Sequence, residues 1–313
     1  KDNIWNLIQW FADTRAAEED LLHHFFKFLE QYKTLVHFNG DGFDIPFLLK
    51  RCKHFNLPYS FDNVASFDIY KKVKPYRNLL GLDSLKQKSI EQFLEISRTD
   101  KYNGGQLIEV YKDYLMTHEE GLYDLLILHN EDDLKGMPSI LPILNYPDLL
   151  EHAFTLKEQQ IVDESLADGQ IRHLLKLTCQ SPYSIPVPVQ AAMPPARCRI
   201  EQDQVTFFVE LTEGTLKHFY LDYKDYYYLP FEDRAVHKSI GACVDKEARI
   251  KATASNCYTK TTGFFLPQFE AIWEPVMKQE YKDKMLYAAL GDVYLADEAA
   301  LQKYIKAILS YLK

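Results

Sequence analysis

One carboxylate, Asp44, stands where the sequence predicts that a strand meets a helix. Residues 34–38 form an apolar run with a β-branched member that ends at Asn39-Gly40, a pair suited to left-handed backbone, so the strand should stop there. Pro46 suits the first turn of a helix, and apolar residues then recur at helical spacing. A carboxylate at this junction can bind a divalent ion or cap the first free amides of the helix, and this segment alone leaves both alternatives open.

Two further residues that could take part in metal binding or catalysis lie far along the chain, at His129 and Asp133. Residues 122–135 are rich in apolar side chains and contain neither Gly nor Pro, which predicts a helix. Residues four apart share one helical face, so a proton acceptor that titrates near neutral pH would stand beside a hard oxygen ligand. The alternative is a solvated polar face, because Glu131 and Asp132 are acidic as well.

Together, the two segments resemble a known pair of motifs. The pattern N-G-x-x-F-D-x-P-x-L at residues 39–48 and the pattern H-N-x-x-D-L at residues 129–134 resemble the second and third exonuclease motifs of the DEDD, ribonuclease H-like superfamily. The closest resemblance is to the YprB-type ribonuclease H-like domains. It extends over most of residues 1–146 and includes S-F-D-I-Y at residues 66–70.

This resemblance implies an α/β fold with a ribonuclease H-like mixed sheet flanked by helices, and a metal-dependent 3′–5′ exonuclease that cleaves nucleic acid phosphodiesters. Asp44 and Asp133 would bind Mg²⁺ or Mn²⁺, and His129 would be the general base for the attacking water. Two ions would stabilise both the incoming and the leaving oxygen and lower the pKa of bound water. The residues near Asp44 that would contact a single-stranded end of the nucleic acid are Asn39, Gly40 and Phe43.

The chain departs from the family pattern at the first motif, an aspartate and a glutamate two apart on a central strand. Residues 4–12 match the strand that should follow this motif, so we expect the motif-bearing strand to lie outside the sequence given. The literal D-x-E at residues 245–247 falls in a predicted amphipathic helix, residues 236–250, and is interpreted as a decoy. Either the chain is a truncated fragment, or it has lost two metal ligands and acts as a binding module. In both cases we expect very weak or no nuclease activity from the chain alone.

The composition fits packed globular domains. With 313 residues, 47% of them hydrophobic and 14% aromatic, the chain is long enough for two domains. Its five cysteines are scattered without a C-x-x-C pair, which argues for a reducing compartment and against a zinc site. The sequence contains no apolar run of membrane-spanning length and no recognisable signal peptide, so a cytoplasmic location is expected. The net charge of −9 does not by itself favour nucleic-acid binding, which normally relies on Lys and Arg.

The second half of the chain is expected to form a smaller α+β domain of unknown function. We predict an exonuclease-like domain at residues 1–148, a helical connector and Pro-rich linker at residues 149–195, and the C-terminal domain at residues 196–313. The helical part of the connector should cover residues 156–179. Within the C-terminal domain we expect strands at residues 197–200, 205–211 and 218–223, a hairpin turn at Glu213-Gly214 and an amphipathic helix at residues 299–312.

The most basic stretch, residues 234–260, is a second candidate for contact with nucleic acid. Basic side chains with interleaved aromatic rings fit single-stranded nucleic acid, because the phosphates are neutralised and the bases stack. The alternative is a solvated helix face beside core aromatic residues. The residues predicted to contact nucleic acid here are Lys238, Arg249, Lys251 and Lys260. A third hypothesis, beside the enzyme and the nucleic-acid-binding module, is a scaffold whose C-terminal domain binds a protein.

Overall fold

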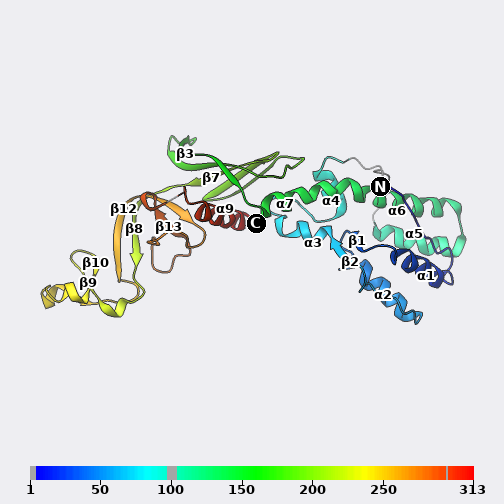
Figure 1. Ribbon diagram of the computed structural model, residues 1–313, viewed down its shortest axis with the longest axis horizontal. Helices are drawn as coiled ribbons and strands as arrows, with labels where there is room; N and C mark the ends of the chain where they lie inside the picture. Colours follow the sequence, from blue (N-terminus) through cyan, green and yellow to red (C-terminus); the bar gives the residue numbers. More distant parts are fainter. Residues whose placement is uncertain (1–4, 97–103, 294) are drawn as a thin grey trace. The chain divides into compact units, whose positions relative to one another are not determined.

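The computed structural model describes residues 5–96, 104–293 and 295–313, which form two compact units (Figure 1). The first unit contains the chain up to Arg77 together with Gly81–Leu149 and Ile185–Val187. The second contains Asn78–Leu80, Leu150–Ser184 and Pro188–Lys313. The first is a mixed α/β region, and the second is largely antiparallel β structure.

A parallel β-α-β element stands at the centre of the first unit. The strands β1 (Thr34–His37) and β2 (Ala65–Asp68) pair in parallel, and the helix α2 (Asp44–His54) lies between them in the chain. This confirms the strand predicted before Asn39 and the helix predicted after it. The other helices up to Glu151 are α1 (Glu18–Leu29), α3 (Ile69–Val73), α4 (Gln87–Phe93), α5 (Gly104–Thr117), α6 (Glu120–Ile140) and α7 (Asn145–Glu151), with the 3₁₀ turns η1 (Lys74–Tyr76) and η2 (Leu141–Leu144).

The helices α1 and α2 are joined by a small apolar core. Leu22 and Phe26 of α1 are buried against Cys52 of α2, as the apolar face of an amphipathic helix requires. The ring of Phe26 also stacks on Tyr59, with 4.7 Å between ring centroids. This packing fixes the direction of α2, and therefore the position of its first residue.

Residues 5–12 are not a strand, contrary to the prediction, and residue 4 lies outside the described residues. The amide of the Gln9 side chain donates a hydrogen bond to the backbone carbonyl of Ile127 on α6, at 3.3 Å. Trp10 contacts Phe28 of α1, with 5.1 Å between ring centroids. The segment is thus held by side-chain contacts with two helices instead of a sheet ladder.

The second unit is built from antiparallel sheets. A five-stranded sheet has the order β3-β4-β7-β6-β5, from β3 (Thr155–Ser165), β4 (Ile171–Gln180), β5 (Val189–Met193), β6 (Ala196–Glu201) and β7 (Gln204–Glu210). A three-stranded sheet β13-β12-β8 contains β8 (Thr212–Phe219), β12 (Tyr258–Gln268) and β13 (Leu286–Ala289). Another, β10-β9-β11, contains β9 (Tyr226–Leu229), β10 (Arg234–His237) and β11 (Ile250–Lys251). The remaining elements are α8 (Lys238–Gly241), α9 (Glu298–Leu312) and the 3₁₀ turns η3 (Tyr223–Asp225), η4 (Lys246–Ala248) and η5 (Leu290–Asp292).

Four sequence predictions for this unit are wrong. The strand predicted at residues 218–223 is only the end of β8, which stops at Phe219, and η3 begins at Tyr223. Residues 156–179 form β3 and β4 instead of a helical connector, because they pair with each other and β4 also pairs with β7. Glu213-Gly214 lies inside β8, and the chain reverses instead between β6 and β7, where Gln202 has a left-handed φ of 54°. Residues 236–250 do not form the predicted amphipathic helix. They contain the end of β10, the short elements α8 and η4, and the start of β11.

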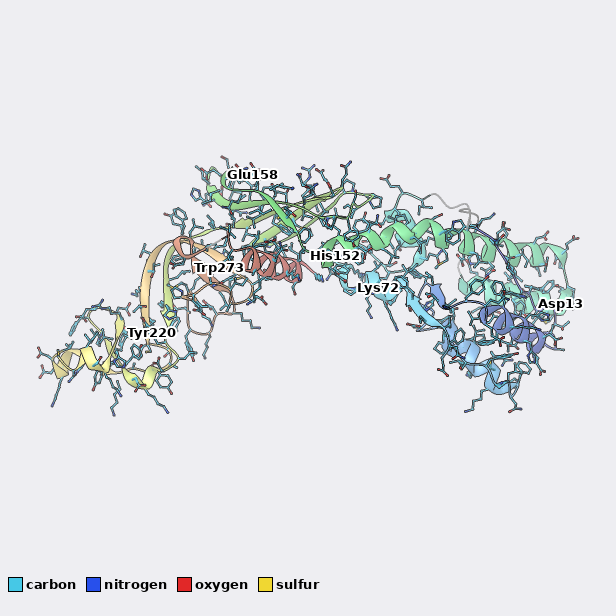
Figure 2. The ribbon with its side chains drawn as sticks, in the orientation of Figure 1. Asp13, Lys72, His152, Glu158, Tyr220 and Trp273 are labelled. Atoms are coloured by element: carbon cyan, nitrogen blue, oxygen red, sulfur yellow. The ribbon has the colours of Figure 1, made fainter. Side chains whose placement is uncertain are left out.

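The C-terminal amphipathic helix is confirmed as α9. Its predicted apolar face is buried and consists of Leu301, Tyr304, Ile305, Ile308 and Leu312. Trp273, labelled in Figure 2, is also buried, and its ring lies 5.0 Å from that of Tyr304. Among the described residues, no helix combines the length and the apolar composition that a membrane crossing requires.

Candidate metal centre

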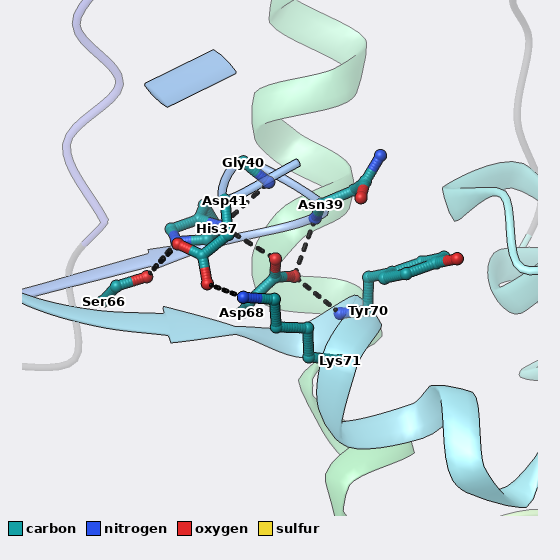
Figure 3. A network of polar contacts seen from close by, with 8 residues as sticks. All are labelled: His37, Asn39, Gly40, Asp41, Ser66, Asp68, Tyr70 and Lys71. Carbon is teal, nitrogen blue, oxygen red and sulfur yellow. Dashed lines mark hydrogen bonds and ion pairs between the residues drawn. The ribbon is translucent and has the colours of Figure 1, made fainter. Parts of the chain in front are cut away.

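The carboxyl ends of β1 and β2 meet at one edge of the parallel sheet (Figure 3). His37 ends β1 and pairs in register with Asp68, which ends β2. The chain leaves β1 through Asn39, whose left-handed φ of 58° suits an asparagine. At Gly40 a Cβ atom would lie 2.6 Å from the imidazole Nδ1 of His37, so the close approach requires glycine. This tight exit keeps the following loop beside the end of β2.

The carboxylate of Asp68 connects the two strand ends. Its Oδ1 accepts hydrogen bonds from the backbone N–H groups of Asn39, at 2.8 Å, and Tyr70, at 3.0 Å. The second bond makes Asp68 the N-cap of α3. Asp68 is 5% exposed, and its other oxygen, Oδ2, is buried without a hydrogen-bond partner in the described part of the chain. One oxygen of this carboxylate is therefore occupied, and the other lies 3.8 Å from Nδ1 of His37.

Asp41 lies at the centre of the polar network drawn in Figure 3. Its Oδ1 accepts a hydrogen bond from the hydroxyl of Ser66 at 2.5 Å, and its Oδ2 accepts one from the ammonium of Lys71 at 2.6 Å. The same hydroxyl is 2.7 Å from Nε2 of His37. The hydrogen bonds from Lys71 and Ser66 lower the pKa of the Asp41 carboxyl, and the Asp41 carboxylate raises the pKa of Lys71. Asp41 is therefore a stabilised anion at this edge of the sheet.

His37, Asp41 and Asp68 together offer an imidazole and two carboxylates as possible metal ligands. One ligand atom from each residue can be chosen so that all three lie within 4.8 Å of one another, and the group could hold a metal ion. The sequence analysis missed this group. The available signal was a histidine four residues before an aspartate, and an aspartate at the end of the next strand. Their proximity depends on the pairing register of β1 and β2, which neither segment indicates alone.

Asp44 occupies the first turn of α2 and is not the residue that caps it. The N-cap position belongs to Phe43, which makes no side-chain capping hydrogen bond. Although Asp44 as a residue is exposed, desolvation of its carboxyl raises the pKa, and the negative charge of Asp68 acts in the same direction. The carboxyl's own backbone N–H and the charge of His37 oppose that rise.

Asp44 also lines a cavity of about 560 Å³ in the first unit. Aromatic and basic side chains share its wall, and Phe43 is 68% exposed. The guanidinium of Arg77 is held by the carbonyls of Leu82 and Asp83, whereas the lysine at this wall, Lys86, is exposed. The other lining residues are Phe38, Asn39, Tyr70, Ser84, Leu85 and Gln87. A carboxylate, flat rings and a cation thus border one cavity.

His129 and Asp133 share one face of α6, as the sequence predicts. Nε2 of His129 lies 3.4 Å from Oδ2 of Asp133. Gln87, which lines the cavity beside Asp44, donates a hydrogen bond to the backbone carbonyl of Asp133 at 3.2 Å. Neither Asp44 nor Asp133 belongs to the group formed by His37, Asp41 and Asp68.

The basic residues predicted to contact nucleic acid belong to the second unit, and three of them have intramolecular partners. The ammonium of Lys260 forms an ion pair with Asp233. The guanidinium of Arg249 stacks over Tyr227, 4.6 Å from the ring centroid, and Lys238 lies 6.0 Å from the same ring. Lys251 is an exposed residue of β11. Three of the four predicted cations therefore have intramolecular partners.

The comparisons with known proteins give one match. No curated protein and no solved structure matches the chain. Residues 1–145 match the family model RNase_H_2, described as RNase_H superfamily.

Proposed function

We propose that residues 1–145, which belong to the ribonuclease H superfamily, act on nucleic acid as a metal-dependent, 3′–5′ exonuclease-like domain. The observation that carries this proposal is the position of Asp44, at the junction of β1 and α2 and in the wall of the cavity. A carboxylate in the wall of a cavity is accessible from that cavity to both an ion and a phosphodiester. Asn39 and Phe43, which line the same cavity, together with Gly40 would contact the strand end.

The donor types fit Mg²⁺ or Mn²⁺, which prefer hard oxygen ligands. Asp44 and Asp133 would hold the ion, and the ion would stabilise charge on the phosphodiester oxygens and lower the pKa of bound water. His129 would accept the proton of the attacking water, since a histidine titrates near neutral pH. The carboxylate of Asp133, 3.4 Å from Nε2, would orient that imidazole.

One aspartate pair cannot complete a two-ion site, and the literal D-x-E at residues 245–247 lies in the other compact unit. We therefore expect the chain alone to bind nucleic acid while hydrolysing it very weakly or not at all. Robust hydrolysis of a single-stranded oligonucleotide by the purified chain with Mg²⁺ or Mn²⁺ would contradict this expectation.

Fluorescence anisotropy with a 5′-labelled single-stranded oligonucleotide tests the binding. We expect Mn²⁺ to increase the affinity of the wild-type chain, and binding to weaken steeply as salt rises from about 50 to 200 mM. Asp44→Asn should abolish the Mn²⁺ effect. Absent or salt-insensitive binding would overturn the proposal and favour a protein-binding scaffold.

A matched pair of variants on α6 tests the assignment of His129. In a longer protein in which a strand carrying the D-x-E motif precedes this chain, Mn²⁺-dependent hydrolysis, followed by gel electrophoresis of the labelled oligonucleotide, should fall with His129→Ala and persist with Asp132→Ala. Both positions are on the same helix, so a general effect on α6 would affect both variants. The reverse ranking would move the functional position away from His129.

A further inference from the structure

We propose that His37, Asp41 and Asp68 bind one divalent transition-metal ion, at a site separate from the ion assigned to Asp44 and Asp133. The proposal concerns the edge of the sheet where β1 and β2 end, and it does not depend on the nuclease assignment. Its starting point is the unpartnered Oδ2 of Asp68.

A buried carboxylate oxygen without a partner is unfavourable unless a cation or a donor reaches it. The side chain of Asp68 is 2% exposed, so bulk water does not solvate this oxygen freely. The imidazole Nδ1 of His37 lies 3.8 Å away, which is longer than a hydrogen bond, and this nitrogen accepts a hydrogen bond from the backbone N–H of Gly40 at 3.0 Å. A divalent ion between these two groups would satisfy the oxygen directly.

The spacing of the three ligands suits one ion. Two ligand atoms on opposite sides of an ion, each bonded at about 2.0–2.2 Å, lie about 4.0–4.4 Å apart. The ligand atoms of His37, Asp41 and Asp68 already lie within 4.8 Å of one another, so only a small contraction is needed. His37 and Asp68 end their strands, and Asp41 lies in the loop that follows β1, so a small shift of this loop would supply the contraction.

An ion bound to Nδ1 of His37 would displace the hydrogen bond from the backbone N–H of Gly40, and the other contacts at the site are easily moved. Lys71 now supplies the positive charge beside Asp41, but its side chain is 62% exposed, and its flexible stem lets the ammonium move into water. The hydroxyl of Ser66 can turn to bond one oxygen of Asp41 while the imidazole binds the ion. The backbone bonds to Oδ1 of Asp68 need not change.

The donor set also indicates the type of ion. An imidazole with two carboxylates is better suited to Mn²⁺, Fe²⁺ or Zn²⁺ than to Mg²⁺, which prefers oxygen ligands and retains its waters. Mn²⁺ is therefore the appropriate probe, because electron paramagnetic resonance reports its free concentration directly.

The test compares Mn²⁺ binding by the chelator-treated wild-type chain with binding by Asp68→Asn and Lys71→Ala. The asparagine keeps an oxygen for the amides of Asn39 and Tyr70 but places an NH₂ group at Oδ2. Asp68→Asn should weaken Mn²⁺ binding at this site by at least about tenfold. Mutation of a residue that only hydrogen-bonds to a metal ligand already lowers metal affinity by about that factor. Lys71→Ala should strengthen binding, because it removes the competing cation from Asp41.

Two control variants separate this site from others. Asp44→Asn should leave binding at this site intact, because Asp44 is not a member of the group. Asp163→Asn changes an exposed aspartate 2.7 Å from His173 in the second unit and should also have no effect. Circular dichroism checks that each variant is folded. The proposal is overturned if neither the wild-type chain nor Lys71→Ala binds Mn²⁺, or if Asp68→Asn binds it as tightly as the wild type.

Discussion

Replacing Asp68 by alanine should destabilise the first unit strongly, because this carboxylate connects β1, β2 and α3. The substitution leaves two partly buried backbone N–H groups, those of Asn39 and Tyr70, without their acceptor. Loss of the N-cap bond to Tyr70 costs about 1 kcal/mol, and loss of a bond from Asn39 to a charged acceptor costs roughly 1.5–3 kcal/mol. We therefore expect Asp68→Ala to lower the free energy of unfolding by roughly 3 kcal/mol.

Asp68→Asn provides the comparison, since it keeps the acceptor and removes only the charge. In metal-free buffer the asparagine should cost about 1 kcal/mol or less, because the weaker bonds are offset by removal of a buried charge. Asp62→Ala, which changes an exposed aspartate in the loop before β2, should change the free energy of unfolding by no more than about 0.5 kcal/mol.

Urea denaturation followed by tryptophan fluorescence is the suitable assay, because Trp10 packs against Phe28 of α1 and reports on the first unit. The two compact units can unfold separately, so the transition of the first unit is fitted on its own. The reasoning fails if Asp68→Ala costs less than about 1 kcal/mol, or if Asp68→Asn costs as much as Asp68→Ala.

Two further predictions concern buried polar groups elsewhere. Burial raises the pKa of Tyr146 to about 12 from 10, so its neutral form stabilises the fold below pH 10 and that contribution, roughly 3 kcal/mol, is lost as the pH rises to 12. Unfolding measured between pH 9 and 12 should show a smaller loss of stability in Tyr146→Phe than in the wild type, by roughly 3 kcal/mol, because other tyrosines with raised pKa values still contribute in both. Equal slopes would contradict the assignment. Gln268 is fully buried, and its side chain forms hydrogen bonds with the backbone of Ile272, Trp273 and Tyr287. Gln268→Ala should therefore lower the free energy of unfolding of the second unit by more than about 3 kcal/mol, measured by thermal or urea unfolding. A decrease near zero would contradict this expectation.

Local patterns predicted the elements that carry the candidate site. The strand before Asn39, the helix that contains Asp44 and the shared face of His129 and Asp133 follow from turn residues and helical spacing over short windows. The group of His37, Asp41 and Asp68 could not be predicted in this way. It depends on which residues of β1 and β2 stand opposite each other, and that register is set by tertiary packing.

The errors in the second unit have a common physical cause. Residues 156–179 contain many good helix formers, such as Lys157, Glu158 and Gln159, and local propensity therefore favours a helix. In the structure, pairing with neighbouring strands overrides that preference, and β4 is an inner strand of the five-stranded sheet, between β3 and β7. Local propensity alone therefore does not distinguish these two strands from a helix, because their pairing partners decide the outcome.

The charges at the end of the β1–β2 sheet constrain how nucleic acid can approach it. Asp41, Asp44 and Asp68 bring three carboxylates to this edge, and Lys71 is ion-paired with one of them. The negative charge of Asp68 already raises the pKa of Asp44, so added phosphate charge would be repelled in the same way. A phosphodiester can approach Asp44 only when cations lie between the two sets of negative charges. Divalent ions would therefore allow a chain with a net charge of −9 to bind a polyanion. The affinity for nucleic acid should depend on Mn²⁺ more strongly at this edge of the sheet than at Lys238 and Arg249 in the second unit.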